Sequence, residues 1–256
     1  MPEVNLEKTL YFPEEIDSAE FLSSPIAILC SGGVESAILS VALTKQFKRV
    51  FPLYVRFGLK WESVELSHLR NYLESVKNPR LAGLTILDQS VADVYPDHWS
   101  LNGISVPDAS TADAAVYLPG RNLLLLTKAA LWSALNGVSM IALGTLSTNP
   151  FPDATDSFFS NLEKALSEGL DHPLKLVSPF GKMHKEDVLQ IGQNMPVHLS
   201  FSCIKPVHKE TGHIHCGACN KCHERYTAFE CAGLVDKTEY ASSHPPTPRA
   251  SKLCTK

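Results

Sequence analysis

The sequence lacks any run of apolar residues that approaches the roughly 18 to 20 needed for a transmembrane helix. Its first segment, MPEVNLEKTLYFPEE, is acidic and has no apolar core of the kind found in secretory signals, so we expect a cytoplasmic protein. A surplus of positive charge is also missing, because the formal net charge is −4. This balance argues against a broad electrostatic grip on nucleic acid, so we expect a small-molecule substrate and neither a nucleic-acid nor a membrane partner.

Two widespread nucleotide-binding motifs are absent as well. There is no Gly-Lys-Ser/Thr loop, which excludes a Walker-type site, and no G-x-G-x-x-G, which disfavours dinucleotide redox cofactors. Hydrophobic residues make up 44% and charged residues 20% of the 256 positions, as in ordinary globular proteins. A chain of this length can form one sizeable domain, alone or with a small satellite.

Short apolar segments alternate with amphipathic ones along most of the chain. The pattern predicts strands near 26–30, 49–57, 81–87, 140–143 and 174–177, and helices near 34–47, 61–76, 122–135, 155–169 and 184–190. Such alternation predicts an α/β fold, a doubly wound, Rossmann-like parallel sheet. Pro52 is unusual for the middle of a strand. The stretch 90–120 is too long for an idle connection, and we interpret it as a lid or substrate loop.

Composition divides the chain into four parts. We expect residues 1–24 to form a lead-in and 25–200 to form the α/β domain. We expect residues 201–241 to form a cysteine-rich, zinc-binding segment packed on that domain. Residues 242–256 are rich in proline and serine, which predicts a disordered tail.

A phosphate-binding loop is predicted directly after the first strand. Ser31, Gly32 and Gly33 follow that strand, and a helix begins near Val34. Ligands of parallel sheets bind at the carboxyl ends of the strands. Glycines there let backbone N–H groups converge on an anion, and the helix N-terminus favours negative charge. Ser31 and Ser36 can add hydroxyl hydrogen bonds. The simpler alternative is a tight turn between strand and helix.

Four of the seven cysteines form a cluster. Cys216, Cys219 and Cys222 recur at every third position, and Cys203 supplies a fourth thiolate. Clustered cysteines in a cytosolic chain indicate metal binding rather than disulfides. Four thiolates satisfy a closed tetrahedral zinc site with a structural role. An iron–sulfur cluster is the competing interpretation, because such sets hold both.

The loop SGGVES, residues 31–36, resembles the Ser-Gly-Gly-x-Asp-Ser loop of the PP-loop ATP pyrophosphatases. Those enzymes bind ATP, adenylate a substrate and release pyrophosphate. The resemblance implies that Ser31, Gly32, Gly33, Val34, Glu35 and Ser36 bind ATP. Glu35 stands where the family usually has aspartate. We expect it to organise Mg²⁺, whose geometry is sensitive to such a change.

Together with the motif CGACNKC, this loop makes residues 26–230 resemble the 7-cyano-7-deazaguanine synthase family. The segments LPGRN (118–122), FPDATDSF (151–158) and PFGKMHKEDVLQIG (179–192) are similar to further motifs of that family. Its members convert 7-carboxy-7-deazaguanine to a nitrile, using ATP and ammonia. The resemblance implies catalytic roles for Glu35, Arg121 and Lys185, and substrate contacts from Phe57, Gly58, Arg121, Asn122 and Asp153. Without it, Arg121 and Lys185 would be interpreted as an ordinary helix-start arginine and a solvated helix lysine.

The departures from the family fall mostly on the substrate side. Its Tyr-Gly-Gln is here Phe57-Gly58-Leu59, and its Cys-Arg after Pro-Asp is Ala154-Thr155. We therefore expect ATP-driven activation of a deazapurine carboxylate by a paralogue that joins it to ammonia or a larger amine. Two alternatives stay open: a tRNA-modifying PP-loop enzyme with an iron–sulfur cluster, and a nucleotide-binding subunit inactivated by Glu35. We also expect a homodimer, with a protein partner or protein substrate left open.

Overall fold

The architecture is a five-stranded parallel sheet with helices on both faces. The computed structural model describes residues 10–13, 23–95, 97–210 and 212–242. The strands are β1 (Pro25–Leu29), β2 (Arg49–Arg56), β3 (Thr85–Asp88), β4 (Met140–Ala142) and β5 (Lys175–Val177). They lie in the order β3-β2-β1-β4-β5, and every pair is parallel. The predicted fold class is thus confirmed.

The chain reverses its direction of winding at β1. It proceeds from β1 to β2 and β3 on one side, then crosses to β4 and β5 on the other. The β1 strand is central, and Ile26, Ala27 and Ile28, whose side chains alternate between the two faces of the sheet, are completely buried. In such sheets the carboxyl ends of the two strands flanking the reversal leave room for a ligand. Here those ends are Leu29 and Ala142, which lie two residues before Ser31 of the predicted phosphate loop and two residues before Gly144.

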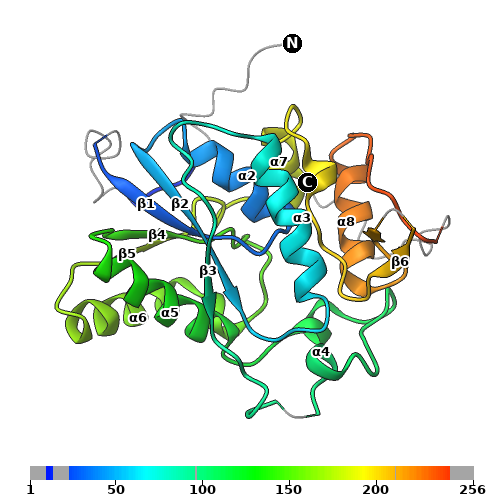
Figure 1. Ribbon diagram of the computed structural model, residues 1–256, viewed down its shortest axis with the longest axis horizontal. Helices are drawn as coiled ribbons and strands as arrows, with labels where there is room; N and C mark the ends of the chain where they lie inside the picture. Colours follow the sequence, from blue (N-terminus) through cyan, green and yellow to red (C-terminus); the bar gives the residue numbers. More distant parts are fainter. Residues whose placement is uncertain (1–9, 14–22, 96, 211, 243–256) are drawn as a thin grey trace.

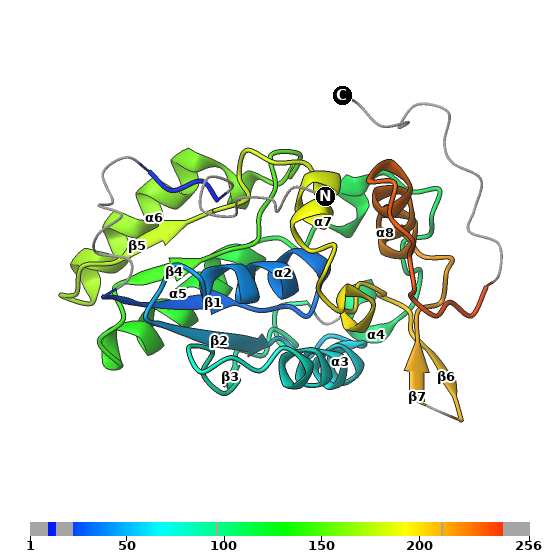
Figure 2. The same cartoon turned by 90° about the horizontal axis from the view of Figure 1, so that it is seen from above.

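The helices form one layer on each face, as Figures 1 and 2 show. Residues of α2 (Val34–Leu43) and α7 (Lys185–Ile191) share one core with Leu69 of α3 (Glu62–Ser75). Residues of α5 (Arg121–Leu135) and α6 (Asp156–Gly169) share another with Ile141 of β4. Burial of apolar faces on both sides explains why the strands are continuous apolar runs.

Element boundaries differ from the predictions by a few residues. The predicted strand 81–87 is confined to Thr85–Asp88, with only an isolated bridge from Leu81 to Val50 before it. The first helix stops at Leu43, short of the predicted end at residue 47. Pro52 does lie inside β2, opposite Ile28 of β1, and the ladder to β3 begins one residue later, at Leu53.

The stretch 90–120 has little regular structure, but it is anchored. It contains one turn of helix, α4 (Trp99–Asn102), and the 3₁₀ turn η2 (Asp113–Val116). Trp99 stacks on Trp61 with ring centroids 5.7 Å apart. Two further 3₁₀ turns, η3 (Pro152–Ala154) and η4 (Val197–Leu199), occur later in the chain.

The cysteine-rich segment consists of a hairpin and a helix beside the main sheet. The hairpin pairs β6 (Val207–Lys209) with β7 (Gly212–Ile214), and the helix is α8 (Asn220–Cys231). Figure 1 shows both at the right of the molecule, away from β5 and α6. Most of the predicted lead-in and tail lies outside the described residues, and the division of the chain near residue 200 stays a prediction.

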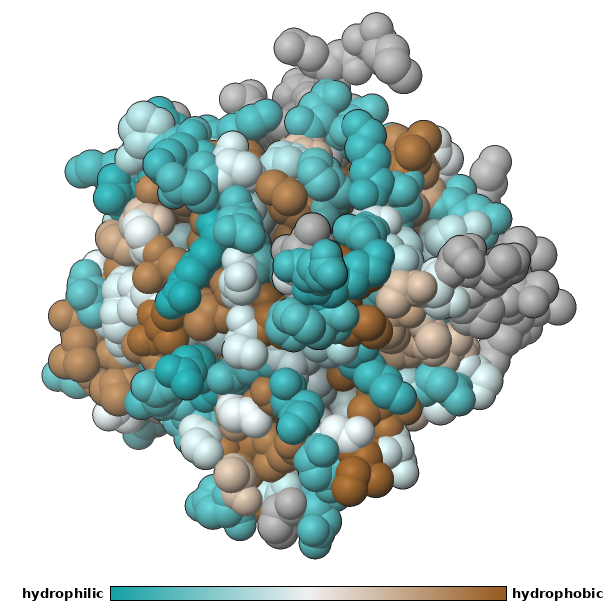
Figure 3. All heavy atoms as spheres, turned by 45° about the vertical axis from the view of Figure 1, so that its right-hand side comes forward, coloured by the Kyte–Doolittle hydropathy of each residue, from teal (hydrophilic) through white to brown (hydrophobic). Residues whose placement is uncertain are grey.

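Across the described ranges, no helix is long and apolar enough to cross a bilayer. Figure 3 shows hydrophilic and hydrophobic side chains interspersed on one face of the molecule.

Candidate nucleotide site and four-cysteine centre

The predicted phosphate loop lies between the end of β1 and the first turn of α2. Gly32 has φ +79°, and a Cβ there would lie 3.2 Å from Glu65 Cγ, so the position favours glycine. The Ser36 hydroxyl accepts a hydrogen bond from the Ser31 N–H at 3.2 Å. The Phe201 N–H donates to the Gly32 carbonyl at 2.7 Å. The loop is thereby preorganised, with the N-terminus of α2 available to an anion.

A lysine from another element reaches this helix start. Lys185, the first residue of α7, places its Nζ 2.8 Å from Glu35 Oε1 and 2.7 Å from Glu224 Oε1. Its side chain is only 11% exposed. Burial alone would lower the pKa of Lys185, but the Glu224 and Glu35 carboxylates outweigh it and raise that pKa above its usual range. A protonated ammonium therefore lies beside the loop across the physiological pH range.

Gly144, the second residue after β4, lies against the same helix start. A Cβ on Gly144 would lie 3.1 Å from Glu35 Cβ and 3.2 Å from the Ser36 nitrogen. The second neighbour is backbone, which cannot rotate away as a side chain can. Glycine is thus required for β4 and α2 to approach this closely.

We expect Gly144→Ala to displace the start of α2 and so the phosphate loop. The free energy of unfolding should fall by about 1–3 kcal/mol, the usual cost of overpacking. Pyrophosphate release should fall more than tenfold. Chemical denaturation and a pyrophosphate assay would measure the two effects.

Gly169→Ala is the matched control for that substitution. A Cβ there meets nothing within 4 Å, and Gly169 is the last residue of α6. Alanine in a helix is favoured by roughly 0.5–1 kcal/mol over glycine, so this variant should be at least as stable as the parent. Equal behaviour of the two variants would contradict the tight approach at Gly144.

A small cavity opens beside the phosphate loop, at the ends of β1 and β2. Its volume is about 30 Å³, and its polar lining comes from Ser31, Tyr54, Glu65 and Arg121. The Tyr54 hydroxyl donates to Glu65 Oε2 at 2.7 Å. The Nε atom of Arg121 is buried and has no hydrogen-bond partner among the described residues. Buried groups of opposite charge thus face one cavity beside the loop.

The turn after β2 is shaped by a second carboxylate. Glu62 Oε2 accepts hydrogen bonds from the N–H groups of Phe57 at 2.6 Å and Gly58 at 2.8 Å. Gly58 has φ +86°, which favours glycine, and Phe57 is almost completely buried. Phe57 lines the cavity, whereas Gly58 does not.

Glu65 is 7% exposed, and its burial raises the pKa of its carboxyl from 4.5 to about 7 against the opposing effects of Arg121 and Tyr54. Its folded-state pKa therefore exceeds its unfolded-state pKa. Between pH 4.5 and 7 the folded protein binds more protons at this group than the unfolded chain. The contribution of Glu65 to stability is consequently present at low pH and is lost as the pH rises through about 7.

Because one pKa unit corresponds to 1.36 kcal/mol, the raised pKa of Glu65 should make the parent lose about 2–3 kcal/mol of unfolding free energy between pH 5 and pH 8. We expect Glu65→Gln to lack this loss, since glutamine does not titrate. Denaturant titrations at both pH values would measure it. Glu74→Gln, on the exposed side of α3 with a 69% exposed side chain, is the matched control. An unchanged pH dependence in Glu65→Gln would contradict the raised pKa.

Two of the predicted substrate residues bind each other. The Asn122 N–H donates to Asp153 Oδ2 at 2.9 Å, and its side-chain amide donates to the Asp153 carbonyl at 3.0 Å. Asp153 is buried and lies in η3, and it caps the N-terminus of α5, whose own first residues supply no cap. These contacts explain both side chains without a ligand. A substrate role for either stays a prediction.

The four predicted metal ligands are brought together. The sulfur atoms of Cys203, Cys216, Cys219 and Cys222 all lie within 4.8 Å of one another, and all four residues are buried. Two sulfur pairs are 3.9 Å apart. A tetrahedral ion with metal–sulfur bonds of about 2.3 Å requires sulfur separations of about 3.8 Å. The donor set therefore fits a closed, metal-binding centre.

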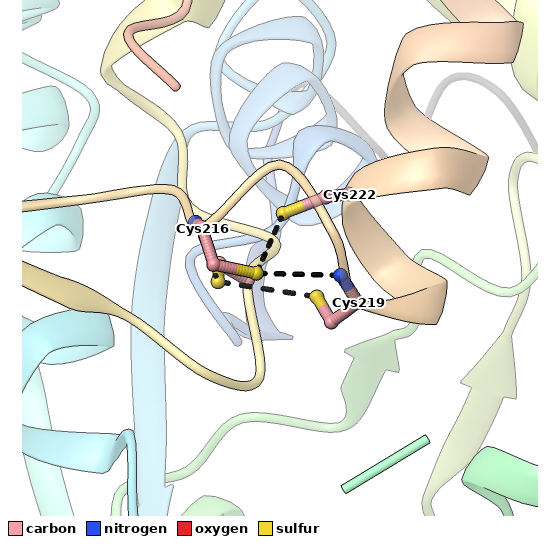
Figure 4. Close-up of side chains that lie close together, drawn as sticks. Cys216, Cys219 and Cys222 are labelled. Carbon is pink, nitrogen blue, oxygen red and sulfur yellow. Dashed lines mark hydrogen bonds between the residues drawn. The ribbon is translucent and has the colours of Figure 1, made fainter. Parts of the chain in front are cut away.

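The backbone of residues 216–219, which we call the cysteine knuckle, donates hydrogen bonds to a cysteine sulfur. N–H groups of Cys219 and Ala218 point at Cys216 Sγ, at 3.3 and 3.4 Å. Figure 4 shows Cys216, Cys219 and Cys222 with their sulfurs turned toward one another at the start of α8. Hydrogen bonds to the anionic form stabilise thiolates, which are the metal-binding form.

The cysteine centre is tied to the long stretch 90–120. The Ala109 N–H donates to the Ala218 carbonyl at 3.0 Å, and the Asn220 N–H donates to the Pro107 carbonyl at 3.0 Å. The four cysteines also share a core with Phe57 and Leu118. A metal bound here would therefore brace the loop that leads to Arg121.

The structure thus groups the predicted nucleotide and substrate residues into three places, apart from the four cysteines. Ser31 to Ser36 and Lys185 meet at the start of α2, Arg121 and Phe57 meet at the adjacent cavity, and Asn122 and Asp153 meet at the start of α5. Sequence reasoning missed Glu65 and Glu224. Glu65 could have been noticed, because it shares the apolar face of α3 with Trp61 and Leu69. Nothing in the sequence pairs Glu224 with Lys185.

Fold and site together define a class: an α/β nucleotide-binding protein with a glycine loop after its central strand and a four-cysteine centre. A sequence profile of the family described as "Queuosine biosynthesis protein QueC" matches residues 26–233. The chain belongs to this family, and it is accordingly an ATP-dependent enzyme that forms a carbon–nitrogen bond.

Named relatives agree with this assignment. A 7-cyano-7-deazaguanine synthase of Methanopyrus kandleri is 30% identical over 225 residues, which cover 83% of this chain and 97% of the relative. One of Methanothrix thermoacetophila is 27% identical, with 83% of this chain and 96% of the relative covered. A solved structure of the U34-tRNA thiolase NcsA of Methanococcus maripaludis, with its [4Fe-4S] cluster, has a TM-score of 0.44 at 15% identity and covers 73% of this chain and 59% of the thiolase. That likeness is too remote to inform substrate or metal.

Proposed function

We propose that the enzyme adenylates a deazapurine carboxylate, 7-carboxy-7-deazaguanine or a close relative, and transfers its acyl group to nitrogen. A carboxylate oxygen attacks the α-phosphorus of ATP, the bond to the β-phosphate oxygen breaks, and pyrophosphate leaves. The nitrogen of ammonia or an amine then attacks the acyl carbon, loses a proton and expels AMP. The observation that carries the proposal is the ATP-type loop, with Glu35 and Lys185 in contact, in a chain of this family.

Each group at the loop has a defined task in this scheme. Backbone N–H groups of Gly32 and Gly33 and the start of α2 bind the pyrophosphate. Lys185 balances the charge that develops on the departing pyrophosphate. Glu35 would hold Mg²⁺, which when bound neutralises phosphate charge. Arg121, whose buried Nε has no partner in the described chain, would bind the carboxylate or an α-phosphate oxygen.

The four cysteines are proposed to hold zinc in a structural role. The set is closed, because all four tetrahedral positions are taken by thiolates. It leaves no open position for substrate.

The substrate side supports a paralogue within the family. Leu59 replaces a glutamine and is 7% exposed, and Ala154-Thr155 replaces Cys-Arg at the start of α6, where Thr155 serves as the N-cap. Loss of these polar groups favours an acceptor other than ammonia, such as a larger amine on a small molecule or a protein.

The product distinguishes the two forms of the proposal: an enzyme that makes the nitrile with ammonia, and a paralogue that makes an amide with a larger amine. ATP, 7-carboxy-7-deazaguanine and ammonia would be incubated with the enzyme, with pyrophosphate release followed by assay and products by mass spectrometry. We expect pyrophosphate release with this acid and an amide product with primary amines. Formation of the nitrile from ammonia at ordinary turnover would contradict the proposal of a paralogue. Absence of pyrophosphate release with every deazapurine acid would contradict the proposed function as a whole.

We further propose a cytoplasmic homodimer. Leu123, Leu131 and Leu135 of α5 are 41%, 45% and 79% exposed and recur at helical spacing along one side of the helix. Such a stripe is costly to leave in water. Light scattering coupled to gel filtration would test it, with a Leu131→Glu/Leu135→Glu variant expected to be monomeric.

A further inference from the structure

Four charged side chains of alternating sign connect the phosphate loop to the cysteine centre. Glu35 pairs with Lys185 at 2.8 Å, Lys185 with Glu224 at 2.7 Å, and Glu224 with Lys221 at 2.5 Å. The series begins on α2, passes through α7 and ends on the first turns of α8. Each of the four side chains is at most 33% exposed. Solvent screening is therefore weaker here than at surface ion pairs.

Lys185 contacts two carboxylates, Glu35 and Glu224, and nucleotide-bound Mg²⁺ would draw only Glu35 away from it. In the proposed function, Glu35 must turn from the lysine to Mg²⁺ when nucleotide arrives, and Lys185 must turn to phosphate. Glu224 lies on α8, whereas Glu35 lies on α2, so Glu224 can keep its contact with Lys185 throughout this exchange. A lysine released by both carboxylates would have a flexible four-carbon chain and no fixed position.

The helix that carries Glu224 is held firmly. Arg225, its neighbour, is completely buried, and its guanidinium donates to Ser200 Oγ at 2.9 Å and to the Val197 carbonyl at 2.8 Å. The same loop contacts the phosphate loop, where the Phe201 N–H donates to the Gly32 carbonyl. Glu224 is thus fixed relative to both the loop and the cysteines.

We propose that Glu224 is a positioning residue: it holds Lys185 in place while Glu35 exchanges that lysine for nucleotide-bound Mg²⁺. This inference rests on the proposed function for the identity of the ligand. It assigns a task to a residue outside the phosphate loop and the substrate cavity. It also explains why a residue two positions after Cys222 contacts the loop side of the molecule.

A defined consequence is a change in the Mg²⁺ requirement. Without Glu224, Glu35 is the one carboxylate left in contact with Lys185, so Mg²⁺ has to displace a lysine that has lost its second carboxylate partner. Glu224→Gln should therefore raise the half-saturating Mg²⁺ concentration for nucleotide binding about five- to tenfold. A residue that merely supported α8 would leave this competition unchanged.

The test is calorimetric titration of the metal-loaded protein with ATP over a series of Mg²⁺ concentrations. This measurement needs neither acceptor substrate nor turnover, so it stands even if the proposed acid proves wrong. Lys221→Met is the matched control, because it removes the outer partner of Glu224 and leaves the pair with Lys185. Cysteine-bound metal, measured by mass spectrometry, should be unchanged in both variants.

The outcomes are distinct. A five- to tenfold shift in Glu224→Gln, with Lys221→Met within twofold of the parent and Glu224→Asp in between, supports the proposal. An unchanged Mg²⁺ dependence in Glu224→Gln overturns it, as does an equal shift in Lys221→Met. Loss of metal from Glu224→Gln also overturns it, because Glu224 would then belong to the support of α8.

Discussion

Replacing Glu35 by alanine is expected to lower pyrophosphate release by at least two orders of magnitude. Glu35 lies in the first turn of α2, in contact with Lys185. In the proposed site it is the carboxylate that holds nucleotide-bound Mg²⁺. Removing one preorganised electrostatic partner from an active site typically lowers kcat by about 10²–10³. Release of pyrophosphate from ATP with the deazapurine acid, followed under saturating Mg²⁺, would measure the loss.

Glu35→Asp is the conservative companion to that variant. It keeps the charge, withdraws the carboxylate by one methylene and restores the residue usual in PP-loop enzymes. We expect it to retain activity within about tenfold of the parent, because Mg²⁺ can adjust by keeping an additional water. An alanine variant as active as the parent would remove Glu35 from the mechanism. Inactivity of the parent with every acid tested would instead favour a degenerate nucleotide-binding subunit.

The sheet could be predicted because each strand is a short apolar run between turn residues. Periodicity placed all five strands and the main helices, since burial on both faces leaves a clear pattern. The ends were less accurate: residues 81–84 have the composition of a strand, but only Leu81 bridges to β2 before β3 begins. The hairpin of β6 and β7 has three residues per strand, too few for a period to show.

The site was predictable where contacts are local in sequence and unpredictable where they are not. The loop at 31–36 and the cysteine knuckle are short motifs whose spacing carries their chemistry. Glu224 and Lys185 are 39 positions apart, and their pairing depends on how α7 and α8 pack. The sequence shows that Glu65 is unusual, because it is a carboxylate on an apolar helix face. It does not show the partners of Glu65, which are Tyr54 of β2 and Arg121 of α5.

The cysteine centre has the largest expected effect on stability. Its four cysteines share a buried core with the turn after β2 and with the stretch that precedes α5. Ala218 of the cysteine knuckle and the adjacent Asn220 hydrogen-bond to that stretch. Loss of the metal would leave four buried thiols in this core, and would loosen both the cavity and the support of Lys185. Metal binding and folding of this segment are therefore expected to be coupled.

Cys219→Ser should reduce bound metal from about one ion per chain to nearly none and lower the free energy of unfolding by more than about 3 kcal/mol, because structural zinc sites contribute folding energy directly. Elemental analysis and denaturant titration would measure both. Cys30→Ala is the control for metal content, since Cys30 is equally buried but lies outside the cluster, and it should keep the full complement.

The identity of the metal decides between the two classes of enzyme considered from the sequence. Zinc gives a colourless protein, whereas an iron–sulfur cluster absorbs visible light and supplies redox or sulfur chemistry. We expect zinc in the purified protein and no visible absorption, consistent with a centre closed by four thiolates. Iron with visible absorption in protein purified without oxygen would instead support the tRNA-modifying alternative. Full metal content in Cys219→Ser would show that Cys219 is not a ligand.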